Sequence, residues 1–63
     1  MIEAGGMAVA WRSFTRTDDN GCVHYCAAER ECVVLSVILG FARIEWVSDG
    51  ERTVKQVSEM RPE

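Results

Sequence analysis

The chain has 63 residues, a formal net charge of −3 and a hydrophobic fraction of 48%. This hydrophobic content is typical of a globular domain and argues against a disordered tail. A chain of this length forms one domain and buries only about 60% of its unfolded surface, so it depends on a small core or on a partner. The acidic balance argues against general attraction to nucleic acids or anionic membranes.

Three features of the sequence bear on the cellular location. Residues 1–6 have neither the basic segment nor the long apolar core of a signal peptide. The longest apolar run, residues 32–42, is about half the ~20 residues that a membrane-spanning helix needs. Three cysteines are an odd number for a secreted disulfide framework. We therefore expect a cytoplasmic protein that has free thiols and no membrane contact.

The first expected element is a β-hairpin. Residues 1–6 are expected to be a flexible lead-in, because their paired glycines weaken regular structure, and residues 7–63 to form a single small β domain. The run AVAWRSFTRT, residues 8–17, is rich in β-branched and aromatic residues and predicts a strand. The following Asp-Asp-Asn-Gly, residues 18–21, is a strong turn signal.

The middle of the chain, residues 22–38, allows two interpretations. As strands, residues 22–28 and 32–38 pair through a loop at 29–31, and a turn at Leu39-Gly40 follows. As a helix, residues 23–39 contain a favourable Ala-Ala-Glu-Arg-Glu segment and end at a glycine. The second half of this segment is rich in valine and isoleucine, which favour strands. We prefer the strands and keep the α+β arrangement, with a helix at about 23–39 and a C-terminal hairpin, as the alternative.

A second hairpin is expected around Ser48-Asp49-Gly50. Residues opposite each other on antiparallel strands share a face, so a correct register pairs apolar residues with each other. A three-residue loop achieves this by placing Ile44 opposite Val54, with Gly50 where φ must be positive. The successive registers then share one inward-facing set, the predicted core: Phe14, Val23, Tyr25, Val33, Leu35, Val37, Ala42, Ile44, Trp46 and Val54.

The predicted fold is all-β, a five-stranded antiparallel meander curled into a small barrel, because a flat sheet of this size leaves its edges open. The segments WVSDG, residues 46–50, and VSEMRP, residues 57–62, resemble the closing part of SH3-like small barrels of the Tudor or KOW kind. Those barrels often show an aromatic residue, an Asp-Gly turn and a final basic-proline step. The resemblance covers about a third of the chain and implies an SH3-like fold. The first half offers no aromatic cage, so methyl-lysine recognition is not carried over.

Three cysteines and the histidine raise the question of zinc. Along a strand, Cys22 and Cys26 are about 13 Å apart, too far for two thiolates on one ion with Zn–S bonds of ~2.3 Å. Only His24, Cys26 and Cys32 could converge, across the loop at 29–31, and a Cys26–Cys32 disulfide is conceivable there too. We expect the cysteines to pack as small apolar residues, with no metal and no other cofactor. A zinc-stabilised binding domain stays as an alternative.

No catalytic constellation is present in the sequence. The single histidine has no serine, cysteine or carboxylate at a spacing that predicts a proton relay. A chain this small also has little room for a cleft, and no glycine-rich phosphate loop is found. We therefore predict that the protein is not an enzyme.

The leading functional hypothesis is a small non-catalytic protein-interaction module, a regulator or inhibitor of a larger complex. In the registers above, Val34, Ile38, Phe41 and Val47 face outward, and Trp11 lies off the core pattern. A contiguous outward strip of this kind indicates a protein partner or a homodimer, with Phe41 as the anchor. Very small acidic proteins of this type are often encoded by phages and mobile elements.

A nucleic-acid-associated barrel is the second hypothesis. It uses a local basic stripe made of Arg12, Arg16, Arg43, Arg52 and Lys55. Because the whole chain is acidic, nucleic acid ranks behind protein as the expected partner.

Overall fold

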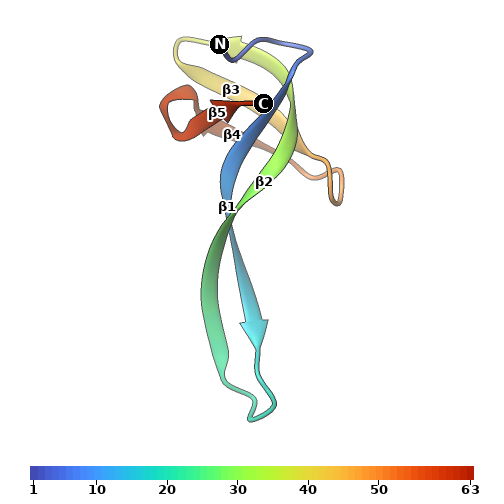
Figure 1. The fold of residues 1–63 in the computed structure, drawn as a ribbon, viewed down its shortest axis with the longest axis vertical. Coiled ribbons are helices and arrows are strands. Elements are labelled where there is room, and N and C mark those ends of the chain that lie inside the picture. Colours follow the sequence, from blue (N-terminus) through green and yellow to red (C-terminus); the bar gives the residue numbers. More distant parts are fainter.

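The computed structural model describes all residues, 1–63, as five antiparallel strands in one sheet (Figure 1). The elements are β1 (Met7–Thr17), β2 (Val23–Ile38), β3 (Phe41–Trp46), β4 (Arg52–Gln56), a 3-10 turn η1 (Val57–Glu59) and β5 (Met60–Pro62). The strand order is β4-β3-β2-β1-β5. The prediction of an all-β fold is confirmed. The alternative helix at about 23–39 is wrong, and the structure has no helix of the length and apolarity that a membrane span requires.

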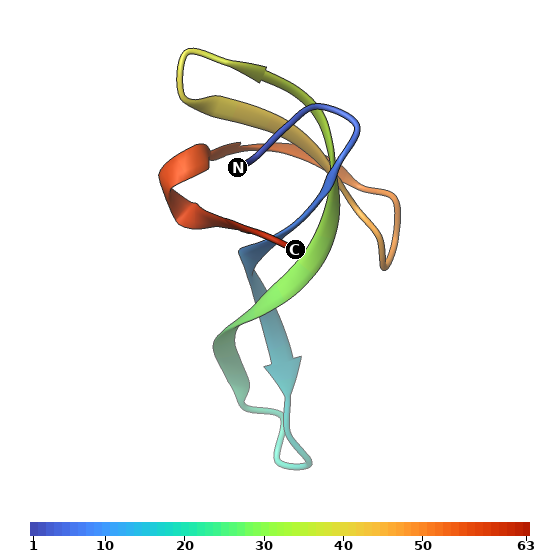
Figure 2. The ribbon, with the colours of Figure 1, turned by 45° about the horizontal axis from the view of Figure 1, so that its top comes forward.

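The molecule has two parts, which we name the body and the arm. β1 pairs along its whole length with residues 23–33 of β2, from Met7 opposite Val33 to Thr17 opposite Val23. On the outer edge of β1, β5 covers no more than residues 8–10, and on the outer edge of β2, β3 covers no more than residues 32–38. Residues 11–29 are therefore a two-stranded ribbon, the arm, which projects from the curled body in Figures 1 and 2. The molecule is accordingly elongated, with extents of 43 × 20 × 17 Å.

The sheet curls in the body without closing into a barrel. The chain runs through β1 to β4 as a meander, and β5 then returns to the free side of β1. β4 and β5 are the two ends of the sheet and do not pair with each other. The 3-10 turn η1 connects them across the open side.

The core lies entirely within the body. Its eight buried residues are Ala8, Ala10, Cys32, Val34, Ala42, Ile44, Trp46 and Met60. Ile2 and Val57 pack against this cluster. The N-terminal segment is also attached by its backbone, since the amide of Gly5 donates to the carbonyl of Val34 at 2.7 Å. No residue of the arm is buried.

The predicted loop at 29–31 is wrong, because β2 is one continuous strand of 16 residues. Glu29, Arg30 and Glu31 lie opposite Trp11, Ala10 and Val9 of β1 in an unbroken ladder. Three charged residues suggested a loop because a strand in a two-layered core would bury one of them. At the base of a solvated ribbon the charges stay exposed, so the strand continues at no desolvation cost.

The predicted inward face of β2 is also wrong, and a β-bulge is the cause. The turn at Leu39-Gly40 is confirmed, with positive φ at both residues. Between Val34 and Ser36 the register shifts, so that Val34, and not Leu35, lies opposite Ile44. One extra residue exchanges the two faces of a strand. The residues of β2 in the core are therefore Cys32 and Val34.

The second hairpin has a longer loop than predicted. The observed register places Ile44 opposite Thr53, and Val54 opposite Arg43 on the exposed face. The loop comprises residues 47–51, and Gly50 has the expected positive φ. Of the predicted core only Ala42, Ile44 and Trp46 are buried. The other members are partly or largely exposed: Phe14, Val23, Tyr25, Val33, Leu35, Val37 and Val54.

Candidate functional site

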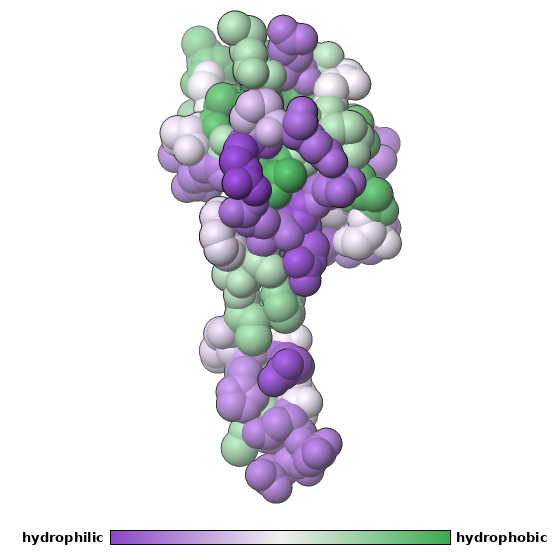
Figure 3. Space-filling model, in the orientation of Figure 1, coloured by the Kyte–Doolittle hydropathy of each residue, from purple (hydrophilic) through white to green (hydrophobic).

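The arm exposes large apolar side chains on both of its faces. Tyr25 is 89% exposed, and the side chains of Trp11, Phe14 and Val23 are also exposed to solvent. Figure 3 shows a hydrophobic zone along the middle of the arm, between the body and a hydrophilic tip. An isolated two-stranded ribbon is only marginally stable in water because it has no core. The arm therefore displays apolar surface without gaining burial from it.

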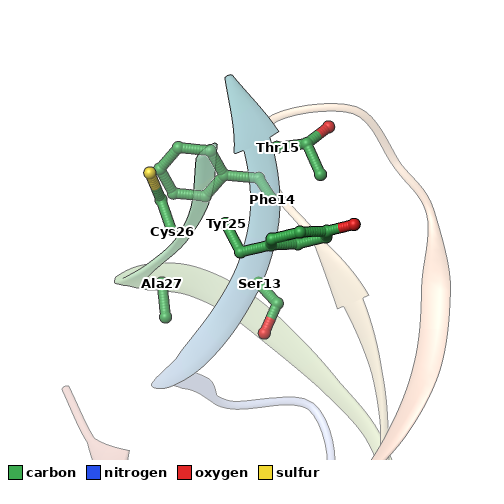
Figure 4. A pocket seen from close by; sticks show the side chains of 6 residues that line it. All are labelled: Ser13, Phe14, Thr15, Tyr25, Cys26 and Ala27. Carbon is green, nitrogen blue, oxygen red and sulfur yellow. The ribbon is translucent and has the colours of Figure 1, made fainter. Parts of the chain in front are cut away.

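The side chains of the arm follow the alternation of its two strands. Phe14 lies opposite Cys26, and the guanidinium carbon of Arg30, on the same face, is 5.7 Å from the centroid of the Phe14 ring. Tyr25 lies opposite Thr15 on the other face. Figure 4 shows the phenyl ring of Phe14 beside the Cys26 thiol, with the Tyr25 ring directed away from them.

These side chains border an open hollow of about 420 Å³. It is lined by Ser13, Phe14, Thr15, Tyr25, Cys26 and Ala27 (Figure 4). Two strands cannot enclose a ligand, and binding pockets for small molecules bury most of the ligand surface. The hollow is therefore better suited to the side chains of another protein than to a small molecule.

Both edges of the arm carry unpaired backbone groups. The amide of Val34 donates to Gly6 at 2.8 Å and its carbonyl accepts from Gly5, so both groups of Val34 point to the β1 side. The carbonyl of Glu31 points the opposite way, where it accepts from the amide of Val47 at 3.2 Å. Because this direction alternates along a strand, the odd-numbered residues of β2 direct their amides and carbonyls away from β1.

This alternation identifies the free groups of the arm. On the β2 edge they belong to Val23, Tyr25 and Ala27, together with the amide of Glu29, and on the β1 edge to Trp11, Ser13, Thr15 and Thr17. The carbonyl of Glu29 accepts a hydrogen bond from the guanidinium of Arg30 at 3.0 Å. No third strand pairs with either set. An exposed edge of this kind is a template for a strand of another chain.

Arg12 fastens the base of the arm to the body. Its guanidinium nitrogens donate to Asp49 at 2.8 and 3.2 Å and to Glu51 at 2.7 Å, in the loop between β3 and β4. The guanidinium carbon also lies 5.1 Å from the centroid of the Trp46 ring. These contacts raise the pKa of Arg12 above its ordinary value, chiefly through the hydrogen bond to Asp49, and the same bond lowers the pKa of Asp49. Arg61 of β5 pairs with Glu29 as a second link.

The tip of the arm is organised by Asp18. Its carboxylate accepts hydrogen bonds from the amides of Asn20 and Cys22, both at 2.9 Å, and lies 3.0 Å from Nε2 of His24. These bonds lower the pKa of Asp18, with the His24 contact as the largest cause. The aspartate thus closes the turn that residues 18–21 predicted.

The predicted partner-binding strip is divided by the structure. Val34 is only 1% exposed, so its place in the strip is wrong, and the bulge in β2 is the reason. Ile38 and Phe41 are exposed and lie opposite each other beside the turn at 39–40. Val47 is exposed beyond the opposite end of β3, and Trp11 is exposed at the base of the arm. These residues do not form one contiguous strip.

The predicted basic stripe is likewise dispersed. Arg12 is engaged by Asp49 and Glu51, and Arg52 donates to Glu45 at 3.0 Å. Arg43 and Arg52 lie on the exposed face of β3 and β4, while Lys55 lies on the other face, 5.9 Å from the Trp46 ring. Arg16 is near the tip of the arm.

The three candidate zinc ligands do not converge. Cys26 and Cys32 lie on the same continuous strand, six residues or about 20 Å apart. This separation also removes the conceivable Cys26–Cys32 disulfide, and all three cysteines are free thiols. No group of three or more potential ligands is found in the structure. Burial raises the pKa of the Cys32 thiol, which packs in the core.

Comparison with known proteins gives no assignment. No family model, no characterised protein sequence and no solved structure matches this chain.

The sequence alone did not reveal the arm as a site. The sequence predicts a hairpin that contains Phe14 and Tyr25 but assigns both side chains to the core, whereas the structure exposes them. The signal that could have found it is the length of the first two strands relative to the short strands that follow, which cannot cover them.

Proposed function

We propose that the protein is a small non-catalytic protein-interaction module, and that the arm, residues 11–29, is its docking element. One observation carries this proposal. The arm combines exposed aromatic side chains on both faces with unpaired backbone groups on both edges, while it contributes no residue to the core. Aromatic side chains dominate protein–protein contacts, and exposed strand edges add backbone hydrogen bonds to them.

The body serves as the anchor of the arm in this proposal. Arg12 and Glu29 connect the two strands of the arm to the β3–β4 loop and to β5. An arm held in this way is suited to insertion between parts of a larger complex, as expected of a regulator or inhibitor. The curled five-stranded body supports the proposed SH3-like relationship, although function does not follow from fold.

The nucleic-acid hypothesis has less support. Two of its five basic residues, Arg12 and Arg52, are already paired with carboxylates, and the stripe is spread over different faces. Salt separates the two hypotheses, since phosphate contacts weaken steeply with salt and apolar contacts do not.

The test is capture of partners from an extract of the native cell after nuclease treatment, at low and high salt. Baits are the wild-type protein, Tyr25→Glu in the arm and Phe41→Glu in the body, both exposed aromatic residues. We expect the wild type and Phe41→Glu to retain the same protein at both salt concentrations, and Tyr25→Glu to lose it. Retention by Tyr25→Glu together with loss by Phe41→Glu would place docking at the Ile38–Phe41 turn and contradict the proposal.

A further inference from the structure

We infer that the arm docks on a second copy of this chain, β2 edge against β2 edge, with the two Cys26 residues facing each other at the two-fold axis. The inference rests on the proposed function, because it names the partner that the arm accepts. In the resulting dimer, the two arms would form one four-stranded antiparallel ribbon.

Symmetry limits how two arms can pair. A closed dimer uses the same surface of both copies. Pairing β1 of one copy with β2 of the next would leave both outer edges free and continue into an open-ended assembly. Among arrangements that pair strand edges of the arm, only two are closed, one through each edge.

The β1 edge is disfavoured by its charges. Its outward-facing residues are Trp11, Ser13, Thr15 and Thr17, so the antiparallel pairing that uses all of them is centred on Phe14. That pairing places Arg12 opposite Arg16 of the second copy, and the symmetry repeats the contact. Like charges directly opposite each other destabilise a sheet.

The β2 edge has no such conflict. Its outward-facing residues, Val23 to Glu29, are centred on Cys26, so full pairing joins Tyr25 to Ala27 of the second copy and Val23 to Glu29. On the other face, His24 meets Ala28. Small residues stand opposite the large rings, and Glu29 is already neutralised by Arg61. Every outward amide from residue 23 to residue 29, and the carbonyls of Val23, Tyr25 and Ala27, gain a partner. The carbonyl of Glu29, which accepts from the guanidinium of Arg30 in the single chain, receives an amide of the second copy as well.

The position of Cys26 allows this arrangement to be detected by disulfide cross-linking. Its own amide and carbonyl point to β1, so at the axis the two Cys26 residues form a non-hydrogen-bonded pair, with Cα atoms about 4.5 Å apart. A disulfide requires Cα atoms at roughly 4.4–6.8 Å. Cys22 lies at the exposed tip and would meet Arg30 of the second copy, and Cys32 is buried in the body.

The chain offers a matched pair of variants to test the edge. Ser13 and Ala27 lie directly opposite each other in the arm, and each directs its amide outward, Ser13 on the β1 edge and Ala27 on the β2 edge. Proline removes that amide and fixes φ at about −65°, and it is tolerated on an edge strand where the amide faces solvent. Because both variants carry the same change of φ, Ser13→Pro controls for it. We expect wild type and Ser13→Pro to sediment as dimers and Ala27→Pro as a monomer, all with the same circular dichroism spectrum. A dimeric Ala27→Pro protein, or a wild type that stays monomeric at its solubility limit, would overturn the inference.

A second measurement requires no proline in either strand. Diamide, an oxidant that accepts two electrons and two protons from a pair of thiols, should link the wild-type protein into a covalent dimer. We expect Cys22→Ser to cross-link as the wild type does and Cys26→Ser to remain uncross-linked. Cross-linking that depends on Cys22 and not on Cys26 would contradict the pairing.

The inference and the proposed function fail in different ways. If the wild type is monomeric but Tyr25→Glu loses a captured protein, the second copy is excluded as the partner and the arm remains the docking element. If the wild type is dimeric and Ala27→Pro leaves the dimer intact, the inference is wrong. If Ser13→Pro and Tyr25→Glu also leave the dimer intact and Tyr25→Glu still retains every captured protein, the arm is not the docking element, and the proposed function is wrong as well.

Discussion

The body and the arm are built from the same two strands, yet they differ in what those strands bury. At the body end, β1 and β2 are flanked by β5 and β3, and Ala8, Ala10, Cys32 and Val34 are buried. Farther along, the same strands are paired only with each other, and every side chain is at least partly exposed. Backbone pairing alone therefore does not produce a core. Burial requires that the sheet be wide enough to curl over itself.

Under the proposed function, this difference separates the residues that stabilise the fold from those that bind a partner. Hydrophobic burial is the main favourable term in folding, and here it is confined to the body. The aromatic side chains of the arm contribute nothing to this core, and in the proposed function they contact another chain. Substitutions in the two parts should consequently affect different measurements.

The largest expected effect contrasts two aromatic residues. Trp46 is 3% exposed in the body and Tyr25 is 89% exposed in the arm. We expect Trp46→Ala to lower the free energy of unfolding by about 3–5 kcal/mol, enough to unfold so small a domain. Tyr25→Ala should change it by less than about 0.5 kcal/mol. Urea denaturation in dilute solution checks both, and equal losses would show that the arm is part of the folding core.

A smaller effect tests the bulge that sets the faces of β2. Val34 is buried opposite Ile44, whereas Val54 is exposed on the outer face of β4. Valine and threonine have the same shape, so Val34→Thr buries a hydroxyl group and should cost about 1–3 kcal/mol. Val54→Thr places the same group in water and should be nearly neutral. The reverse order of the two melting temperatures would mean that the register without the bulge is correct.

A pH effect should report on the link between arm and body. The hydrogen bond from Arg12 lowers the pKa of Asp49 in the folded state. Because the pKa of Asp49 is lower in the folded than in the unfolded chain, the contact stabilises the fold fully at pH values above the unfolded-state pKa, about 3.9. This stabilisation is lost as the pH falls through the folded-state pKa. We expect the melting temperature of Asp49→Asn to fall less than that of the wild type below about pH 4. Asp19→Asn, at the tip and without an ion pair, is the control and should follow the wild type. If the melting temperatures of all three proteins fall equally with pH, Asp49 does not stabilise the link between arm and body.

Local chemistry explains which features the sequence could predict. The turns at 18–21 and at 39–40, and the positive φ of Gly50, each depend on a few adjacent residues, and all three are found in the structure. The bulge in β2 has no such signal, because Val34 and Leu35 suit either face. One shifted residue then reversed the predicted faces of the strand.

The candidate site could not be predicted for a different reason. Phe14 and Tyr25 have the composition of core residues, and only the absence of a third strand beside them makes them surface. The contact of Arg12 with Asp49 joins residues 37 positions apart in the sequence, and no local pattern indicates it. Both features depend on which segments distant in the sequence come to lie beside each other.

Amide hydrogen exchange at low and high protein concentration tests the central claim most directly, because it observes both edges of the arm in the unaltered chain. The account predicts that the outward amides of Tyr25 and Ala27 gain protection as the concentration rises. Those of Ser13 and Thr15, on the other edge, should exchange at an unchanged rate, and the buried core amides of Val34 and Ile44 should be protected throughout. Protection that rises on the β1 edge, or on neither edge at any concentration, would contradict docking of the arm on a second copy through β2.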